Sequence, residues 1–173
     1  MMIRKLAKDD AKCFWELRFK ALIEDGDAFG ATYDEEVSKP LDNLILRFNN
    51  EYIEPKEDNF ILGAFNEENK IIGVIALRRE RRIKLRHKAT IWGMYVSKKY
   101  RKNGLGKLLL SECLNIAKSI EGLEQINLCV VSRNIKAKNL YKSMNFETYA
   151  IEKNAIKFDN KYYDEDYMVY FVK

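Results

Sequence analysis

Hydrophobic positions in the first fifty residues follow two patterns. Residues 2–6 predict a short strand, and at 14–22 apolar side chains follow at helical spacing, with Trp15 beside the stripe. The segment 24–39 is polar and acidic and has no clear period, so we expect a loop there. Pro40 then starts a second helix, because proline fits a first helical turn and apolar residues at helical spacing follow it.

From residue 60 onward the period changes to that of strands. After a loop at 54–59, three apolar runs with short links predict antiparallel neighbours at 60–65, 71–79 and 87–96. Apolar residues at 105–120 then recur at helical spacing over about four turns.

The last fifty residues continue the alternation of strand and helix. The continuous apolar run at 125–131 suits a strand buried on both faces. A helix at 134–144 and two further strands follow, at 146–153 and 166–173. We therefore expect one α/β (α+β) domain over residues 1–173, with a mixed, mostly antiparallel sheet flanked by helices.

The composition is that of a globular protein, with 47% hydrophobic and 33% charged residues. No apolar run reaches the ~20 residues of a membrane span, and the N-terminus lacks an apolar signal core, so we expect a cytoplasmic protein without a membrane partner. Cys13, Cys113 and Cys129 lie far apart in apolar segments, which favours reduced thiols in the core. His87 is the only histidine, and no metal site is expected.

The net charge of +5 is compatible with nucleic acid, an anionic cofactor or a solvated surface. In the most basic run, RRERRIKLRHK at 78–88, Ile83 and Leu85 alternate with basic residues, which predicts a strand with one face in water. The aromatic, zinc-finger and zipper patterns of nucleic-acid binders are absent from the sequence. We therefore favour the solvated face and expect no nucleic-acid partner.

Two of the eight glycines, Gly104 and Gly106, stand where a strand and a basic turn lead into a leucine-rich helix. The first turn of a helix has unpaired N–H groups and a positive dipole end, and glycines let the backbone approach an anion. Positive charge around this point comes from Arg101, Lys102 and Lys107. The pattern predicts a pyrophosphate site, the alternative being a simple turn with solubilising basic residues.

Two other phosphate-binding motifs do not fit this stretch. A Walker loop needs Ser or Thr after Gly-Lys, where the chain has Leu108. A dinucleotide fingerprint needs a third glycine where the chain has Leu109.

The stretch RKNGLG at 101–106 resembles the R/Q-x-x-G-x-G/A signature of the GCN5-related N-acetyltransferases (GNATs). Downstream, SRNIKAKNLYKSMNF at 132–146 resembles the family's N-x-x-A-x-x-L-Y-x-x-x-G-F segment, with the strand at 125–131 between the two blocks. The resemblance covers roughly residues 60–150. It implies a GNAT-like fold and acetyl-CoA as co-substrate.

The resemblance also assigns roles to residues. Tyr141 matches the tyrosine that protonates the departing thiolate, and a phenol of pKa ~10 can donate to a thiolate whose conjugate acid has a pKa near ~8.5. Asn134 matches an asparagine that contacts the cofactor arm, although it equally suits a helix N-cap. The backbone of the strand before the signature would hold the cofactor arm and polarise the thioester carbonyl. The expected cofactor-binding residues are Met94, Tyr95, Val96, Arg101, Lys102, Asn103, Gly104, Leu105, Gly106, Lys107, Asn134 and Ala137.

Two positions depart from the family pattern. Asn145 replaces the usual glycine, and asparagine tolerates the left-handed conformation that a helix end requires. Trp92 and Gly93 stand where many members carry a glutamate base. No base is assigned from the sequence; the alternatives are no dedicated base at all or one of His87, Glu24, Asp25, Asp34, Glu35 and Glu36.

These features predict an N-acetyltransferase that transfers acetyl from acetyl-CoA directly to a primary amine of a small molecule or peptide in a ternary complex. The acidic segment 24–39 suggests a cationic acceptor, such as a polyamine, an aminoglycoside or a peptide N-terminus. The missing strand glutamate leaves one alternative, a non-catalytic acyl-CoA-binding regulatory module. Both a monomer and a homodimer are compatible with the sequence.

Overall fold

The apolar runs at 60–131 and the C-terminal segments form the strands of one twisted sheet in the computed structural model, which describes residues 1–53 and 58–172. Within these residues the sheet order is β1-β2-β3-β4-β5-β7-β6, and every neighbouring pair is antiparallel except β4 with β5. This confirms the mixed, mostly antiparallel sheet. The strands are β1 (Met2–Lys5), β2 (Phe60–Phe65), β3 (Ile71–Arg79), β4 (Lys88–Val96), β5 (Gln125–Val131), β6 (Glu147–Phe158) and β7 (Lys161–Phe171).

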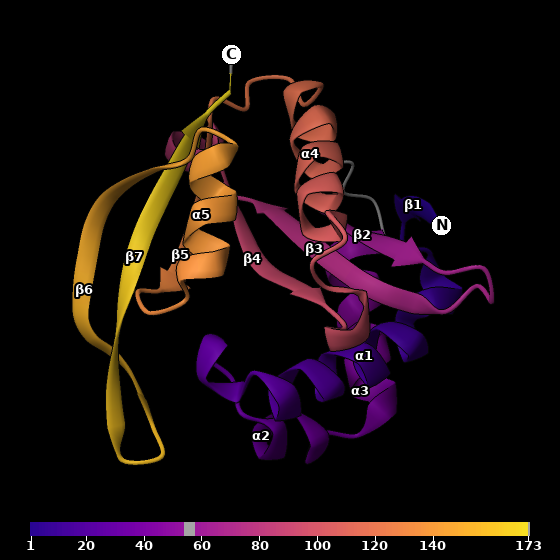
Figure 1. The fold of residues 1–173 in the computed structure, drawn as a ribbon. Coiled ribbons are helices and arrows are strands. Elements are labelled where there is room, and N and C mark those ends of the chain that lie inside the picture. Colours follow the sequence, from indigo (N-terminus) through magenta and orange to yellow (C-terminus); the bar gives the residue numbers. More distant parts are fainter. Residues whose placement is uncertain (54–57, 173) are drawn as a thin grey trace.

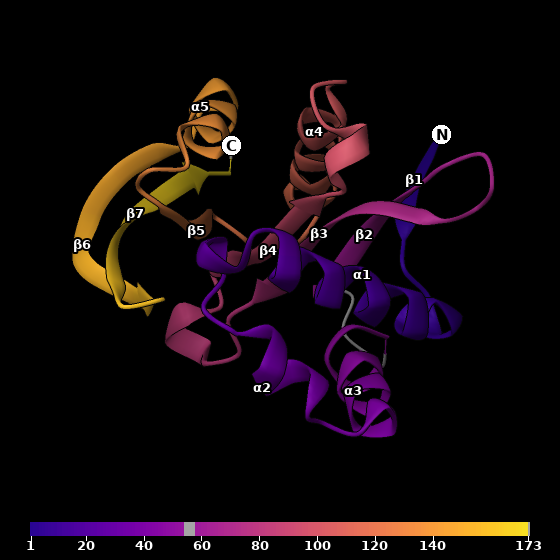
Figure 2. The same ribbon diagram turned by 60° about the horizontal axis from the view of Figure 1, so that its bottom comes forward.

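Helices cover both faces of the sheet (Figure 2). On one face lie α1 (Ala11–Glu24), α2 (Tyr33–Val37) and α3 (Leu41–Phe48), and on the other lie α4 (Leu105–Lys118) and α5 (Ile135–Ser143). The helix at 134–144 is confirmed, with Asn134 and Met144 as its two caps. Each helix within the described residues is too short or too polar to traverse a bilayer.

Each face of the sheet has its own apolar core. Leu109 and Cys113 of α4 pack against Ile75 of β3 on one face. On the other, α1 and α3 bury Phe14 and Trp15, and the Trp15 Nε1 donates a hydrogen bond to the Leu44 carbonyl at 3.0 Å. A fully buried side chain of this size stabilises the fold by about 1.5–3 kcal/mol, so the helical stripes anchor α1 and α4 to the sheet.

The segment 24–39 is not the unstructured loop expected from its polarity. It contains a 3-10 turn at Gly26–Ala28 and the short helix α2. Thr32 and Glu35 form a capping box: the Thr32 hydroxyl accepts from the Glu35 N–H at 3.2 Å, and the Glu35 carboxylate accepts from the Thr32 N–H at 2.8 Å. The T-x-x-E spacing was therefore a helix signal within an acidic segment.

The basic run at 78–88 is not a continuous strand. β3 ends at Arg79, and residues Ile83–Leu85 form a 3-10 turn in which Ile83 is 90% exposed. Arg79 holds this connection: its guanidinium donates to the Arg86 carbonyl at 2.6 Å and to the Glu121 carbonyl at 2.8 Å. The alternation of Ile83 with basic residues therefore did not reflect burial. Residues 54–57 of the loop expected at 54–59 lie outside the described residues.

Two expectations about burial were wrong. Cys113 is buried as expected, but Cys13 and Cys129 are exposed rather than core thiols. β5 alternates buried and more exposed residues instead of being buried on both faces. The helices on the α1 side lie mainly under β1 to β4, so one face of β5 is left less covered (Figure 2).

The C-terminal hairpin is longer than its predicted strands. Asp159 and Asn160 both have positive φ, 49° and 56°, and make a tight turn between β6 and β7. Adjacent positive φ values at two central residues are typical of a type I′ turn, which suits the twist of a hairpin. Asn145, after α5, has φ 65° and confirms the left-handed helix end. Residue 173 of the strand expected at 166–173 lies outside the described residues.

Candidate active site

The parallel pair β4 and β5 is hydrogen-bonded only at one end. Within the described residues the register covers Lys88 with Gln125, Ala89 with Ile126 and Thr90 with Asn127. Beyond these pairs the two strands diverge (Figure 1). Because β4 still pairs with β3 on its other side, only the edge that faces β5 lacks ladder partners at Met94–Val96. Such an edge has main-chain donors and acceptors that can bind an extended ligand.

A β-bulge lies beside this opening. The register between β3 and β4 shifts so that Ala76 faces Gly93 and Leu77 faces Ile91, which leaves Trp92 as the extra residue. A bulge of this kind redirects the side chains that follow it. Met94 consequently packs in the core with α4, whereas Trp92 and Tyr95 pack in the core with α1.

The turn at 97–104 delivers the N-terminus of α4 to the same end of β4. Gly104 is the N-cap with φ 75°, and the first helical bond runs from the Leu108 N–H to the Gly104 carbonyl at 3.1 Å. Within the described residues, no side chain caps this end. The N–H groups of the first turn therefore lack intrahelical partners, and together with the helix dipole they suit an anion.

The two glycines of this stretch differ in their surroundings. A Cβ added at Gly104 would meet nothing within 4 Å, so the space is open and only the positive φ requires glycine. A Cβ added at Gly106 would lie 3.3 Å from side-chain atoms of both Leu140 and Met94. Gly106 therefore permits close packing of α4 against α5 and β4, in addition to any contact with a ligand.

The basic residues of the signature also differ in their contacts and exposure. The Arg101 Nε donates to the Val96 carbonyl at 2.8 Å, and its guanidinium forms an ion pair with Asp25 at the end of α1. The hydrogen bond with Asp25 raises the pKa of Arg101. Arg101 thus ties the turn to α1, whereas Lys102 and Lys107 are exposed, as is Asn103.

Tyr141 of α5 reaches across to β4. Its ring is buried against Phe146, with centroids 5.8 Å apart, and its hydroxyl donates to the Met94 sulfur at 3.8 Å. Burial raises the pKa of Tyr141, so the group stays a neutral phenol and a hydrogen-bond donor. The structure therefore brings Tyr141 and Met94, 47 residues apart in sequence, to the opening between β4 and β5.

Asn134 caps α5, one of its two expected roles. Its side-chain oxygen accepts a hydrogen bond from the Ala137 N–H at 3.1 Å. Ala137 and Asn134 thus form the first turn of the helix that carries Tyr141.

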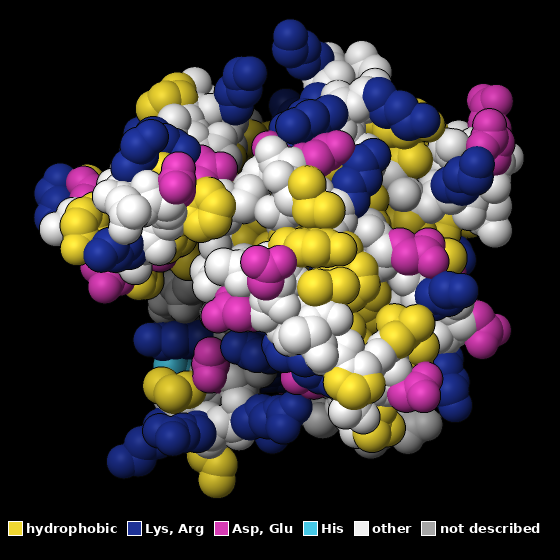
Figure 3. Space-filling model, turned by 90° about the horizontal axis from the view of Figure 1, so that it is seen from below, with side chains coloured by type: hydrophobic (Ala, Val, Ile, Leu, Met, Phe, Trp, Pro, Cys, Tyr) yellow, Lys and Arg dark blue, Asp and Glu magenta, His cyan; other side chains and the backbone are white. Residues whose placement is uncertain are grey.

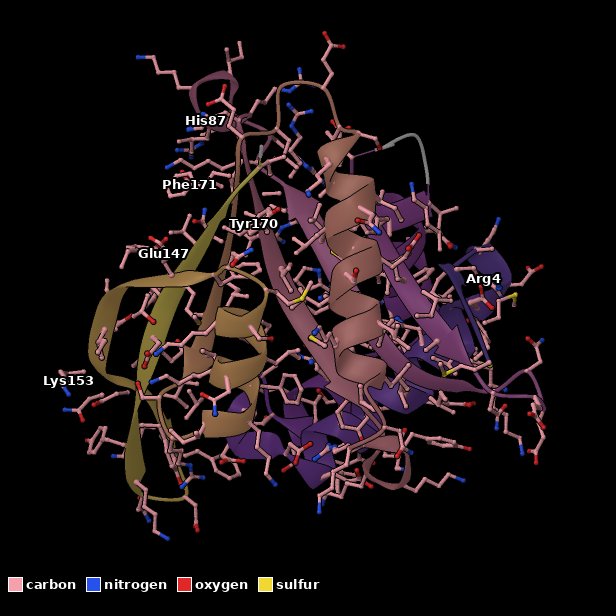
Figure 4. The ribbon with its side chains drawn as sticks, turned by 45° about the horizontal axis from the view of Figure 1, so that its top comes forward. Arg4, His87, Glu147, Lys153, Tyr170 and Phe171 are labelled. Carbon is pink, nitrogen blue, oxygen red and sulfur yellow. The ribbon has the colours of Figure 1, made fainter. Side chains whose placement is uncertain are left out.

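Most carboxylates considered as bases are engaged by the protein itself. The Tyr95 hydroxyl donates to the Glu24 carboxylate at 2.5 Å, which is also 3.8 Å from the Lys20 ammonium. Glu35 belongs to the capping box of α2. His87 lies at the other end of β4 (Figure 4), roughly 20 Å from Met94 at the rise of an extended strand, which is too far to take a proton there. Asp25 pairs with Arg101, and Glu36 pairs with Lys39 at 3.0 Å.

A hollow that is open to solvent lies on the α1 side of β4, and the space in and above it, open solvent included, is about 290 Å³. Its apolar wall includes Phe14 and Leu17 of α1, and its floor includes Gly93 and Met94 of β4. Arg18 also lines it, and the sequence reasoning missed this residue. The available signal was a charged side chain within the apolar stripe of α1. Figure 3 views the molecule from this side.

Metal-ligating side chains do not gather here. In the part of the chain that the structure describes, no group of three or more His, Cys, Asp or Glu side chains is arranged to hold a metal ion.

The model of the acetyltransferase (GNAT) family matches residues 14–146 of the sequence. The chain belongs to the GNAT family of acetyltransferases. Its acyltransferase activity and its family, both expected from the two sequence blocks, are thereby confirmed. Comparison of the sequence with curated proteins finds no match.

Solved structures of GNAT proteins share the whole fold. A GNAT acetyltransferase from Streptococcus pneumoniae is 24% identical with a TM-score of 0.85, each chain being covered to 99%. YncA from Salmonella typhimurium, solved with its cofactor acetyl-CoA, is 19% identical with a TM-score of 0.84, over 100% of this chain and 94% of that one. A phosphinothricin acetyltransferase from Sinorhizobium meliloti in complex with acetyl-CoA is 18% identical with a TM-score of 0.82, over 99% of this chain and 88% of that one.

Proposed function

We propose that this GNAT protein transfers the acetyl group of acetyl-CoA to a primary amine of a small molecule or peptide, by direct attack in a ternary complex. The observation that carries the proposal is the placement of the Tyr141 hydroxyl beside Met94, at the opening between β4 and β5. That opening lies at the end of β4 from which the turn leads to the uncapped N-terminus of α4.

The residues around the opening fit acetyl-CoA. The open space at Gly104 and the free N–H groups of Leu105 to Lys107 would hold the pyrophosphate, with charge from Lys102 and Lys107. Asn103 is exposed at the same turn. The unpaired edge of β4 would bind the pantetheine arm through its main chain, near Asn134 and Ala137 of α5. Two of the similar solved structures contain acetyl-CoA, in agreement with this assignment.

Acetyl-CoA supplies an activated thioester, and the protein supplies positioning and hydrogen bonds. Main-chain N–H groups on the β4 edge would stabilise the oxyanion that forms when the amine attacks. Tyr141 would donate a hydrogen bond to the departing sulfur, a role that suits a phenol kept neutral by burial.

Cys129, which acts electrostatically on Tyr141, does not suit a covalent route. Desolvation of the Cys129 thiol and the nearby Glu165 carboxylate raise its pKa to about 11. The thiolate is the nucleophilic form of cysteine, so Cys129 is a poor nucleophile at neutral pH. This supports direct transfer from acetyl-CoA to the amine.

A panel experiment tests the proposal. Purified protein is mixed with acetyl-CoA and a set of primary amines, and the acetylated product and free CoA are measured by mass spectrometry, which avoids interference from the exposed protein thiols. At least one amine is expected to be acetylated at a rate proportional to enzyme concentration. Binding of acetyl-CoA without acetylation of any amine would instead favour the non-catalytic acyl-CoA-binding module.

A Gly104 pair tests the phosphate assignment. In Gly104→Val the left-handed conformation costs about 1–2 kcal/mol, so the binding-competent turn is less populated and the Kd for CoA should rise about 5- to 30-fold. Gly104→Asn is the matched control, because asparagine tolerates this conformation and should keep near-normal affinity. An unchanged Kd in Gly104→Val would contradict the assignment.

A further inference from the structure

The hollow beside β4 contains one charged side chain, that of Arg18. Its guanidinium lies 4.5 Å from the centroid of the Phe29 ring and 5.6 Å from that of Trp92. In the described part of the chain it has no hydrogen bond or ion pair of its own. Burial lowers the pKa of Arg18, with a smaller opposing contribution from Glu36. A cation is therefore held among aromatic rings with its five N–H donors unused.

A second donor in the same wall is also unpaired. The Trp92 Nε1 is buried and has no hydrogen-bond partner in the described residues. Buried polar groups without partners are costly, so native proteins keep few of them. Two unpaired donors thus belong to residues that line this hollow, and the partly exposed Arg18 is the one that an acceptor on a ligand can reach.

The carboxylate that acts on Arg18, that of Glu36, does not neutralise it. Glu36 attracts it electrostatically but makes its ion pairs with Lys39 at 3.0 Å and Arg47 at 3.9 Å. Arg47 also pairs with Glu51 at 3.5 Å. Three cations thus share Glu36, and among the described residues the only charged side chain that lines the hollow is that of Arg18.

The acidic segment no longer indicates a cationic acceptor. Asp25 pairs with Arg101, Asp27 pairs with Arg133, and Glu24 accepts from Tyr95. These carboxylates are compensated within the protein, so they do not describe the charge of a ligand.

We propose that the acceptor is a primary amine that carries a carboxylate on a compact apolar scaffold, such as an apolar amino acid, and that Arg18 binds this carboxylate as the specificity-determining residue. The inference rests on the proposed acetyl transfer. A planar guanidinium binds a carboxylate through two parallel hydrogen bonds. Phe14, Leu17 and Val74 contribute apolar wall for the rest of the molecule. Gly93, where an added Cβ would meet nothing within 4 Å, opens the same hollow to the β4 backbone at which the amine would react.

The test compares acceptors that differ only at the carboxylate. Acetylation of L-leucine and L-methionine is measured against leucinamide and methioninamide at saturating acetyl-CoA and about pH 9. Because the amine of a free amino acid is more basic than that of its amide, kcat/KM is expressed per concentration of uncharged amine. Wild-type protein should favour the carboxylates in kcat/KM. Arg18→Gln should lower kcat/KM for the carboxylates about 10- to 100-fold and leave the amides unchanged.

Matched variants separate recognition from folding. Arg18→Lys keeps the charge without the paired donors and should recover part of the preference. Lys12→Gln removes an exposed charge from the same helix and should behave as wild type. The Kd for CoA should be near wild type in all three variants. Thermal unfolding should change only slightly in Arg18→Gln, which loses the contacts with Phe29 and Trp92 but no ion pair.

The outcomes distinguish the two proposals. Acetylation of amides or of spermidine at rates equal to or above those of the amino acids would overturn the Arg18 inference and leave amine acetylation standing. The same conclusion follows if Arg18→Gln leaves the ratio of kcat/KM for the amino acids to kcat/KM for their amides unchanged. If CoA binds but no amine is acetylated, the proposed function fails, and the inference fails with it.

Discussion

Removal of one oxygen atom tests the role of Tyr141. Tyr141→Phe keeps the ring packed against Phe146 and deletes only the hydroxyl, whose partner in the structure is the Met94 sulfur at 3.8 Å. A neutral hydrogen bond contributes about 0.5–1.5 kcal/mol, and a sulfur acceptor lies at the weak end of that range, so the free energy of unfolding should change little.

The expected effect on catalysis is larger. A hydrogen bond to a charged group is worth about 1.5–3 kcal/mol, so loss of the donor to a departing thiolate should lower kcat about 10- to 150-fold. Because the interaction forms only as the thiolate develops, the Kd for acetyl-CoA should stay within about twofold of wild type. Burial raises the pKa of Tyr141, so its deprotonation should cause no loss of activity below about pH 10.

The assay is steady-state product formation at saturating acetyl-CoA and the best amine, paired with calorimetric titration of CoA. Tyr162→Phe is the control, since this tyrosine is exposed on the β6–β7 hairpin. A Tyr141→Phe enzyme with wild-type kcat would falsify the acid role. A fall in CoA affinity with unchanged kcat would show instead that the hydroxyl serves binding.

Two further predictions concern stability and thiol chemistry. Burial alone raises the pKa of Asp166, but hydrogen bonds from Lys138 at 2.7 Å and from Ser132 hold it below its usual value. Lys138→Met should therefore lower the free energy of unfolding in urea by about 3–5 kcal/mol at neutral pH. This loss should become smaller below about pH 4, because Asp166 of the unfolded chain takes up a proton there. An equal loss at pH 3 and pH 7 would contradict this explanation. In thiol alkylation at pH 8, exposed Cys13 should react first and Cys129, with its pKa raised to about 11, more slowly, and equal rates would contradict the desolvation of Cys129.

The order of helices and strands followed from local patterns. Apolar residues at helical spacing correctly predicted α1, α3 and α4, because each of these helices buries one stripe in the cores beside the sheet. Asn145 and Gly104 were recognised as special backbone positions, and both have positive φ. These signals lie within a few residues of the structure that they determine.

Patterns failed where burial depended on distant parts of the chain. The alternation at Ile83 matched a strand, but no second layer covers that turn, and the side chain is solvent-exposed. Cys129 lies in an apolar run, yet one face of β5 is only partly covered by helices. The spacing of hydrophobic residues indicates which side chains share a face of a helix or strand. Whether another part of the chain covers that face depends on tertiary packing.

The charge of the proposed acceptor site could likewise not be predicted from the sequence. Asp25 is 76 residues from its partner Arg101, and Asp27 is 106 residues from Arg133, so an acidic segment in sequence is a compensated surface in the fold. Arg18 behaves in the opposite way, because it is inconspicuous in sequence and uncompensated in the structure. A charge that the protein has already paired contributes little to ligand selection, whereas a partly buried charge without a partner, such as that of Arg18, gains more from one. The charge that the acceptor carries should therefore be inferred from Arg18 rather than from the acidic segment.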